Sequence, residues 1–328
     1  MLVWMHNGEK MKYCMGVNAL KQPMLDFIKE MPMKSGLYNW IRVFDGELLP
    51  YKEILDRTDE YDVIHCNMAP SDWYMIGKIA EKTKNSSTKL VLNNDHICQI
   101  WKGWNQHPQA YIEIQKKGDM IFGTEPIQTA HMIDGAKCIP HPTNTREIGL
   151  FKSKDRANSD SLGIFYHFYY DDPYLTWILM EKLNIGKFYT RLYAYNPKHD
   201  EMERWTPNLF DFVAGKYLPF RQYIFEMLSN RLMYDSCPYY VYGRTNTETA
   251  CIGIPTVGSD TVYSGKICWP ELVCNPLDIV KKKELIEKVW KGGEWVEEQI
   301  KNAKQNVEFF GYEQSKERFL KALDDVKK

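Results

Sequence analysis

The chain has 328 residues, and its 42 Lys plus Arg stand against 43 Asp plus Glu, which gives a formal net charge of -1. That length accommodates two domains of ordinary size, each with its own hydrophobic core. The balanced charge offers no positive field for a phosphate backbone, so we expect no binding of nucleic acid.

Cysteine usage and hydropathy indicate a cytoplasmic protein. The eight cysteines are scattered and none forms a Cys-x-x-Cys pair, as is typical of buried free thiols in a reducing compartment. No apolar stretch approaches the roughly 18 to 20 residues that cross a bilayer, and the N-terminus lacks the long apolar core of a secretion signal. We expect no transmembrane segment, while peripheral contact with a membrane stays open.

In the first half of the chain, short apolar runs alternate with segments of helical character. Apolar runs without alternation are typical of strands buried on both faces of a parallel sheet. The predicted strands are LVWMHNG near the start, YDVIHCN at 61–67, KLVLNND at 89–95, GDMIFGT at 118–124 and AKCIPHP at 136–142. The candidate helices between them include MLDFIKEM, SDWYMIGKIAEKTK and PIQTAHMID. This order predicts a doubly wound α/β domain over residues 1–145.

After a polar linker at 146–160, the same pattern restarts and predicts a second α/β domain over 161–328. Its predicted strands are SLGIFYHF at 161–168, KFYTRLYAY at 187–195, LFDFVAG at 209–215, PYYVYG at 238–243, IPTVGS at 254–259 and ELVCN at 271–275. Its predicted helices are YLTWILMEKL, LPFRQYIFEMLSNRL and ETACIG, followed by a charged tail of helical period from 281 to 328. The fold class is therefore α/β, with two doubly wound Rossmann-like domains and a helical C-terminal tail.

The segment RTNTETACIGIPTVGSD suggests a ligand site in the second domain, because ligands of parallel sheets collect where strands lead into helix N-termini. Four groups suit a diphosphate: the Arg244 guanidinium, the Thr245 and Thr247 hydroxyls and the Asn246 amide. The Glu248 carboxylate can accept hydrogen bonds from the vicinal diol of a ribose. Alternatively, Glu248 only favours its helix N-terminus electrostatically and Thr247 caps that helix.

This segment resembles the EAMACGIPVVGSD signature of GT-B glycosyltransferases, especially the retaining, glycogen-synthase-like and mannosyltransferase-like group. Glu248 matches the second Glu of that signature, and YDVIHCN, KLVLNNDH and AKCIPHPTN resemble family segments of the N-terminal domain. The resemblance implies two Rossmann-like domains facing across a cleft, with nucleotide-sugar binding in the second. It also implies no cofactor and no bound metal, and no Asp-x-Asp stands at a predicted strand end.

Three departures from the family pattern bear on activity. The first family Glu, which contacts the donor sugar, is replaced by Tyr240, which we count among the donor-binding candidates. The Gly-Arg and Lys that bind donor phosphates give way to FYHFYYDDP, and the first glycine-rich turn is reduced to HNGEKMKYCMG. Because charge stabilisation is a large catalytic term, the chain is either a divergent enzyme or an inactive relative. We expect Arg244 to replace one missing cation.

The acceptor-side candidates lie in the first domain. The resemblance implies that His96 approaches the transferring sugar, and its alternative is a turn-capping role. The other candidates are Asp95, Trp101, Trp104, His6 and Asn7. Asp95 has the alternative of a helix N-cap, and the two Trp side chains the alternative of core packing. His65 is predicted as a core residue and His141 as linker structure.

The sequence therefore predicts a glycosyltransferase that moves a sugar from a nucleotide diphosphate sugar to a hydroxyl acceptor, with retention of configuration. Here Glu248 and His96 act at the reaction centre. The acceptor is a glycan or a lipid-linked or protein-linked hydroxyl. The alternatives are an inactive relative that binds sugar nucleotides or glycans as an assembly protein, and a GT-B-shaped enzyme for sugar-nucleotide epimerisation or hydrolysis.

Overall fold

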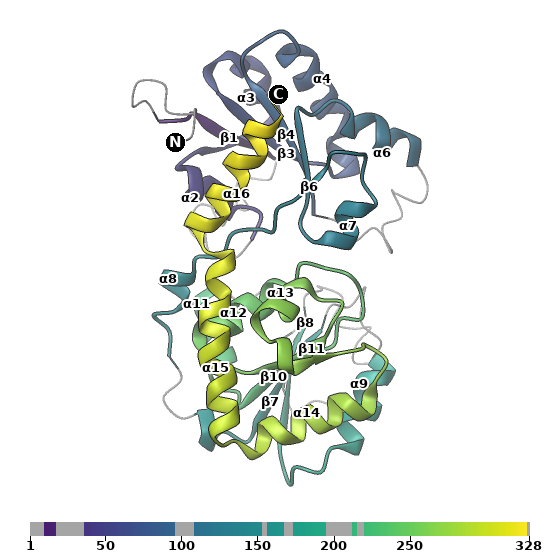
Figure 1. Cartoon of the computed structure of the whole chain (residues 1–328), viewed down its shortest axis with the longest axis vertical. Helices are drawn as coiled ribbons and strands as arrows, with labels where there is room; N and C mark the ends of the chain where they lie inside the picture. Colours follow the sequence, from purple (N-terminus) through teal and green to yellow (C-terminus); the bar gives the residue numbers. More distant parts are fainter. Residues whose placement is uncertain are drawn as a thin grey trace. The chain divides into compact units, whose positions relative to one another are not determined.

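The computed structural model describes residues 10–17, 36–95, 108–152, 156–166, 173–194, 212–214 and 220–326. The chain divides into two compact units, one formed by Met1–Thr143 with Phe310–Lys328 and the other by Asn144–Phe309. Each unit contains one parallel six-stranded sheet (Figure 1). The prediction of two parallel α/β units is confirmed. The predicted strand LVWMHNG and the predicted helix MLDFIKEM lie outside the described residues.

The sheet of the first unit has the order β2-β1-β3-β4-β5-β6. Its strands are β1 (Tyr13–Val17), β2 (Glu47–Pro50), β3 (Val63–Asn67), β4 (Lys89–Asn94), β5 (Met120–Gly123) and β6 (Lys137–Cys138). Its helices are α2 (Asn39–Phe44), α3 (Tyr51–Asp56), α4 (Trp73–Thr83), α6 (Pro108–Gln115), α7 (Pro126–Ala130) and α16 (Tyr312–Asp325). Adjacent residues of β3 enter opposite cores: Val63 packs in one apolar cluster and Ile64 in the other. Such two-sided burial explains the continuous apolar runs of the sequence.

The C-terminal helix α16 belongs to the first unit, which corrects the predicted assignment of the whole tail to the second domain. Phe319 of α16 packs in one cluster with Tyr13, Trp40, Phe44 and other buried residues of the first unit. Figure 1 shows α16, in yellow, beside α2 and β1. The apolar positions spaced by three and four in the tail sequence predicted a helix but did not identify its partner.

The sheet of the second unit has the order β12-β11-β10-β7-β8-β9. Its strands are β7 (Ser161–Tyr166), β8 (Tyr189–Ala194), β9 (Phe212–Ala214), β10 (Leu232–Asp235), β11 (Thr256–Ser259) and β12 (Val273–Cys274). Its helices are α8 (Thr145–Ile148), α9 (Pro173–Lys182), α11 (Phe220–Leu228), α12 (Arg244–Ile252), α13 (Tyr263–Cys268), α14 (Ile279–Lys291) and α15 (Glu294–Asn306). Because α8 contacts α12, the start of the predicted linker packs as part of this unit.

Two predictions for this sheet are wrong. The segment PYYVYG at 238–243 is not a strand: its residues are irregular, with a single bridge from Val241 to Val262. The strand at this place in the order is β10, which was not predicted: its first residue, Leu232, was taken as the last residue of a helix, and its other residues were assigned to no element. In addition, the residues RTNT form the first turn of α12 rather than a loop before it.

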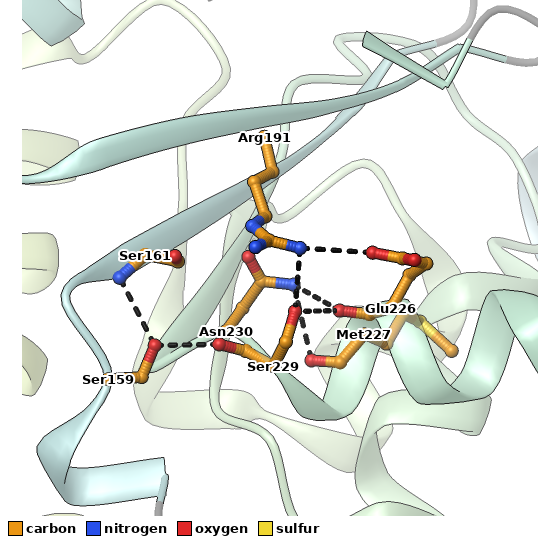
Figure 2. A network of polar contacts seen from close by, with 7 residues as sticks. All are labelled: Ser159, Ser161, Arg191, Glu226, Met227, Ser229 and Asn230. Atoms are coloured by element: carbon orange, nitrogen blue, oxygen red, sulfur yellow. Dashed lines mark hydrogen bonds and ion pairs between the residues drawn. The ribbon is translucent and has the colours of Figure 1, made fainter. Parts of the chain in front are cut away.

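A polar network ties the end of α11 to the amino ends of β7 and β8 (Figure 2). Arg191 of β8 donates to Glu226 Oε2 and to Ser229 Oγ, both at 3.0 Å. Ser159 Oγ donates to the Ser229 carbonyl at 2.6 Å and accepts from the Ser161 N–H at 3.1 Å. This network lies at the amino-terminal ends of the parallel strands. The carboxyl-terminal ends of the strands therefore lie on the opposite side of the sheet.

In the part of the chain that the structure describes, none of the helices is long and apolar enough to cross a membrane.

Candidate functional site

The candidate site in the second unit lies where β10 and β11 end and α12 begins. β10 pairs in parallel with both β7 and β11, so the carboxyl ends of these strands share one edge. Gly243 precedes α12 with φ 80°, and a Cβ there would lie 2.1 Å from Val262 Cγ1. Only glycine combines this left-handed backbone with so close a neighbour. The Ser264 hydroxyl donates to the Gly243 carbonyl and fixes the turn further.

Three residues predicted to surround a diphosphate are buried within the protein: Thr245, Asn246 and Thr247. The Asn246 side-chain amide donates to Asp235 Oδ2 at 2.6 Å, and the backbone carbonyl of Asn246 accepts from the Trp269 indole at 3.2 Å. The Thr247 hydroxyl donates to the Arg244 carbonyl at 2.7 Å. These bonds anchor the first turn of α12 to β10 and to Trp269, so the side chains of Asn246 and Thr247 position the helix.

Asp235, at the end of β10, is a buried residue of this site that the sequence did not single out. Its Oδ1 accepts from the Cys237 N–H at 3.1 Å. Burial raises the pKa of Asp235, and the hydrogen bonds from Cys237 and Asn246 and the charge of Lys282 act in the opposite direction. Lys282 of α14 is itself buried and donates to the Pro276 carbonyl at 2.7 Å. Neither residue was predicted: the strand that ends in Asp235 was not recognised, and Lys282 is one of many charged residues in the predicted helical tail.

Arg244 and Glu248 form an ion pair on α12, with 2.9 Å between Arg244 Nε and Glu248 Oε1. The Glu248 side chain is 1% exposed and the Arg244 side chain 22%, so the arginine is the member of the pair that is partly exposed, although its Nε is buried. Tyr223 of α11 lies near the pair. Burial and then the charge of Glu248 raise the pKa of Tyr223 well above its ordinary value, so its phenol stays protonated. The site therefore offers a partly exposed cationic side chain paired with a buried carboxylate.

Tyr240, which stands where the family has its first Glu, is 39% exposed in the irregular segment before Gly243. A neutral phenol at this position can stack on a ring or accept a hydrogen bond, but it brings no negative charge. The carboxylate of Glu248 therefore has no acidic companion at position 240.

Of the six acceptor-side candidates, only Asp95 belongs to the described residues. His6, Asn7, His96, Trp101 and Trp104 lie outside them. Asp95 follows β4, and its Oδ1 accepts from His141 Nε2 at 2.8 Å.

The histidine behind Asp95 is held in one tautomer. The Trp40 indole donates to His141 Nδ1 at 3.2 Å. Because an indole only donates, His141 carries its proton on Nε2 and donates it to Asp95. His141 is thus a buried residue of the first unit, which corrects its prediction as linker structure. Its partner Trp40 was not predicted, because the two residues are far apart in the sequence.

His65 is confirmed as a satisfied core residue. Its Nδ1 contacts the Tyr13 hydroxyl and its Nε2 lies 2.9 Å from Asn93 Oδ1. Among the described residues, no group of three or more His, Cys, Asp or Glu is placed to hold a metal ion.

No family model matches the sequence, and no curated protein matches it either. Solved structures do resemble it. HepE from Anabaena, in complex with UDP-glucose, is 12% identical, with coverage of 96% of this chain and 100% of that one and a TM-score of 0.66. The trehalose-6-phosphate synthase OtsA is 9% identical, with coverage of 94% and 78% and a TM-score of 0.65. AviGT4, a glycosyltransferase of avilamycin A biosynthesis, is 15% identical, with coverage of 96% and 98% and a TM-score of 0.61.

These similarities extend over nearly the whole chain and include both units. The fold of the protein is the GT-B glycosyltransferase fold, in a strongly divergent sequence.

Proposed function

We propose that the protein is a glycosyltransferase that takes a sugar from a nucleotide diphosphate sugar and transfers it to a hydroxyl acceptor. The observation that carries the proposal is the Arg244–Glu248 pair at the start of α12, beside the carboxyl ends of β10 and β11. In a parallel α/β sheet this edge is where ligands bind. The likeness to HepE, whose structure contains UDP-glucose, supports the same assignment.

In this proposal Arg244 holds the diphosphate of the donor and Glu248 accepts hydrogen bonds from the ribose diol. A guanidinium beside the diphosphate stabilises the negative charge that grows on the leaving group as the sugar departs. The neutral Tyr240 leaves the donor sugar without the carboxylate that the family places there. By resemblance to the retaining group, we propose that the anomeric configuration of the sugar is kept.

Asp95 is our proposed contact for the hydroxyl acceptor in the first unit. Its carboxylate is 36% exposed, and His141 fixes its orientation from behind. A carboxylate in this position accepts a hydrogen bond from a sugar or lipid-linked hydroxyl. We propose His96 as a contact for the transferring sugar.

The donor site is tested by thermal unfolding with UDP, GDP, ADP, CMP and dTDP and with their common sugar conjugates. A ligand at 100 times its Kd adds about 2.7 kcal/mol to the free energy of unfolding. One nucleotide family should stabilise the wild type, and Glu248→Ala should abolish that stabilisation. Arg191→Met is the matched control, because it removes a partly buried ion pair of the same unit at the other edge of the sheet. Stabilisation that survives in Glu248→Ala would contradict the assignment.

A relative that binds sugar nucleotides without transferring sugar is the second candidate. Tyr240 favours it, since the position lacks a carboxylate to contact the donor sugar. The two candidates differ in turnover: with the stabilising nucleotide sugar and a panel of sugar acceptors, a transferase releases free nucleotide and the binding protein does not. A third proposal, sugar-nucleotide epimerisation or hydrolysis, would give a product without any acceptor.

A further inference from the structure

We propose that Arg244 gates Glu248, so that the ribose of a nucleotide is recognised only when a diphosphate is attached to it. The inference rests on the proposed function and adds a rule of specificity to it: the site selects nucleoside diphosphates against nucleosides. In this arrangement the diphosphate draws the guanidinium away from the carboxylate. The carboxylate then becomes available to the ribose hydroxyls of the same ligand.

The exposure of the two side chains sets the order of events. Glu248 is 1% exposed and Arg244, whose Nε lies 2.9 Å from it, is 22% exposed. A ligand that arrives from solvent therefore meets the partly exposed Arg244 side chain before it meets the buried carboxylate. An uncharged diol has no group that competes with a carboxylate for a guanidinium, whereas a diphosphate binds guanidinium through charge-assisted, bidentate bonds.

The position of Arg244 in its helix makes the exchange feasible. Arg244 is the first residue of α12, and a cation there opposes the positive end of the helix macrodipole. Glu248, one turn further along, compensates for this unfavourable position. An anion bound at the helix start satisfies both the macrodipole and the guanidinium, so a diphosphate competes with Glu248 for Arg244 on favourable terms.

Each half of the ligand alone leaves the site incomplete. If a diphosphate without ribose removes Arg244, a buried carboxylate loses its cation, which is strongly destabilising. The protonated phenol of Tyr223 is one neutral donor near this carboxylate, whereas the ribose diol would add two further hydroxyl donors. If a nucleoside without phosphate arrives, Arg244 stays paired with Glu248 Oε1, and the diol must compete with the guanidinium for the carboxylate. Only the whole nucleoside diphosphate provides a new partner for both charges.

The test is calorimetric titration of the full-length protein with UDP, uridine and inorganic pyrophosphate, and with GDP, guanosine, ADP and adenosine. In the wild type, a nucleoside diphosphate should bind while its nucleoside and pyrophosphate bind far more weakly. Arg244→Met should bind the nucleoside about tenfold more tightly than the wild type and lose most of its preference for the diphosphate. Glu248→Gln should bind pyrophosphate about tenfold more tightly, because the guanidinium is no longer held by a carboxylate.

Two further variants separate gating from general damage. Arg244→Lys keeps the positive charge and should retain the preference for the diphosphate. Arg191→Met removes an Arg–Glu pair at the other edge of the same sheet and should leave all affinities unchanged. If Arg244→Met does not fold, the pyrophosphate affinity of Glu248→Gln tests the gate by itself: a tighter affinity than that of the wild type supports the gate, and an unchanged affinity contradicts it.

The outcomes distinguish this inference from the proposed function. If a nucleoside diphosphate binds the wild type but the nucleoside affinity of Arg244→Met and the pyrophosphate affinity of Glu248→Gln are both unchanged, the gate is wrong and the donor site stands. If the folded wild type and its variants bind none of the nucleotides, the proposed function fails and the gate fails with it.

Discussion

At the residue scale, His65 makes the stability of the protein depend on pH. The side chain is fully buried in β3, and burial lowers its pKa from 6.5 to about 3. In the unfolded chain a histidine takes up a proton near pH 6.5, while the folded protein does not protonate His65 until near pH 3. The unfolded state therefore binds more protons between these values. The stability that His65 contributes is fully present above pH 6.5 and is lost as the pH falls.

We predict that His65 accounts for a loss of about 2 kcal/mol in the free energy of unfolding between pH 7 and pH 5. The measurement is urea denaturation at pH 5, 6 and 7 of the wild type and of His65→Gln. The variant should be less stable at pH 7 but should show a shallower decline towards pH 5. His65→Asn, a second uncharged replacement at the same buried position, should show the same shallower decline. A variant of His65 with an unchanged decline would show that the titration belongs to other groups.

In the candidate site, some functional residues could be predicted from the sequence, whereas their contacts could not. Glu248 was singled out because its neighbours resemble a known signature, but it was predicted to begin its helix, whereas α12 begins four residues earlier, at Arg244. Its pairing with Arg244 was missed, although the two are four residues apart, because RTNT was predicted as a turn. The i,i+4 contact exists only if the helix already begins at Arg244.

At the element scale, the start of α12 depends on Gly243, and Gly186 provides a matched comparison. Both have φ near 80° (80° and 78°), but a Cβ on Gly243 would meet Val262 Cγ1 at 2.1 Å and a Cβ on Gly186 would meet nothing within 4 Å. We predict that Gly186→Ala lowers the free energy of unfolding by about 1 kcal/mol, for the left-handed backbone alone. Gly243→Ala should lower it by about 2–4 kcal/mol, because overpacking is added.

Chemical denaturation of the two glycine variants measures this difference. Gly243→Ala should also reduce the stabilisation by a bound nucleotide, since the Ala side chain displaces the first turn of α12. Gly186→Ala should leave that stabilisation unchanged. Equal losses of stability in both variants would mean that the turn before α12 relaxes freely and does not fix the site.

The elements that the sequence predicted correctly are those whose local pattern matches their burial. The runs VIHC, LVL and MIF form strands in the two-sided core of the first sheet, as continuous apolar runs predict. β10 was missed because it has only four residues and the predicted helix extended to the first of them, Leu232. PYYVYG was mistaken for a strand because its aromatic residues favour one. In both places the pairing partner, β7 or β11, decides the structure, and that partner is distant in sequence.

At the scale of the whole molecule, the first unit is built from both ends of the described chain. The second unit, Asn144–Phe309, is one continuous segment, whereas α16 returns to the first unit after it. Local sequence cannot predict this return, because the apolar face of α16 would suit either sheet. Closing so long a loop costs little more than closing a shorter one, since the entropy grows only with the logarithm of length. The gain from burying aromatic side chains outweighs that cost.

Phe319 is therefore predicted to stabilise the first unit and to leave the donor site intact. It is fully buried, with ring centroids 4.9 Å from Phe44 and 5.0 Å from Trp40. Phe319→Ala should lower the free energy of unfolding of the first unit by about 3–5 kcal/mol, as expected for a large cavity in an aromatic core.

Phe309→Ala is the control, because that side chain is 37% exposed and belongs to the second unit. Denaturation followed by tryptophan fluorescence measures the loss for Trp40 and its neighbours, and nucleotide titration of Phe319→Ala should still give the wild-type affinity. If Phe319→Ala weakens nucleotide binding as much as Glu248→Ala does, α12 and the strand ends of the second unit are not sufficient for the donor site. The site would then also depend on the first unit.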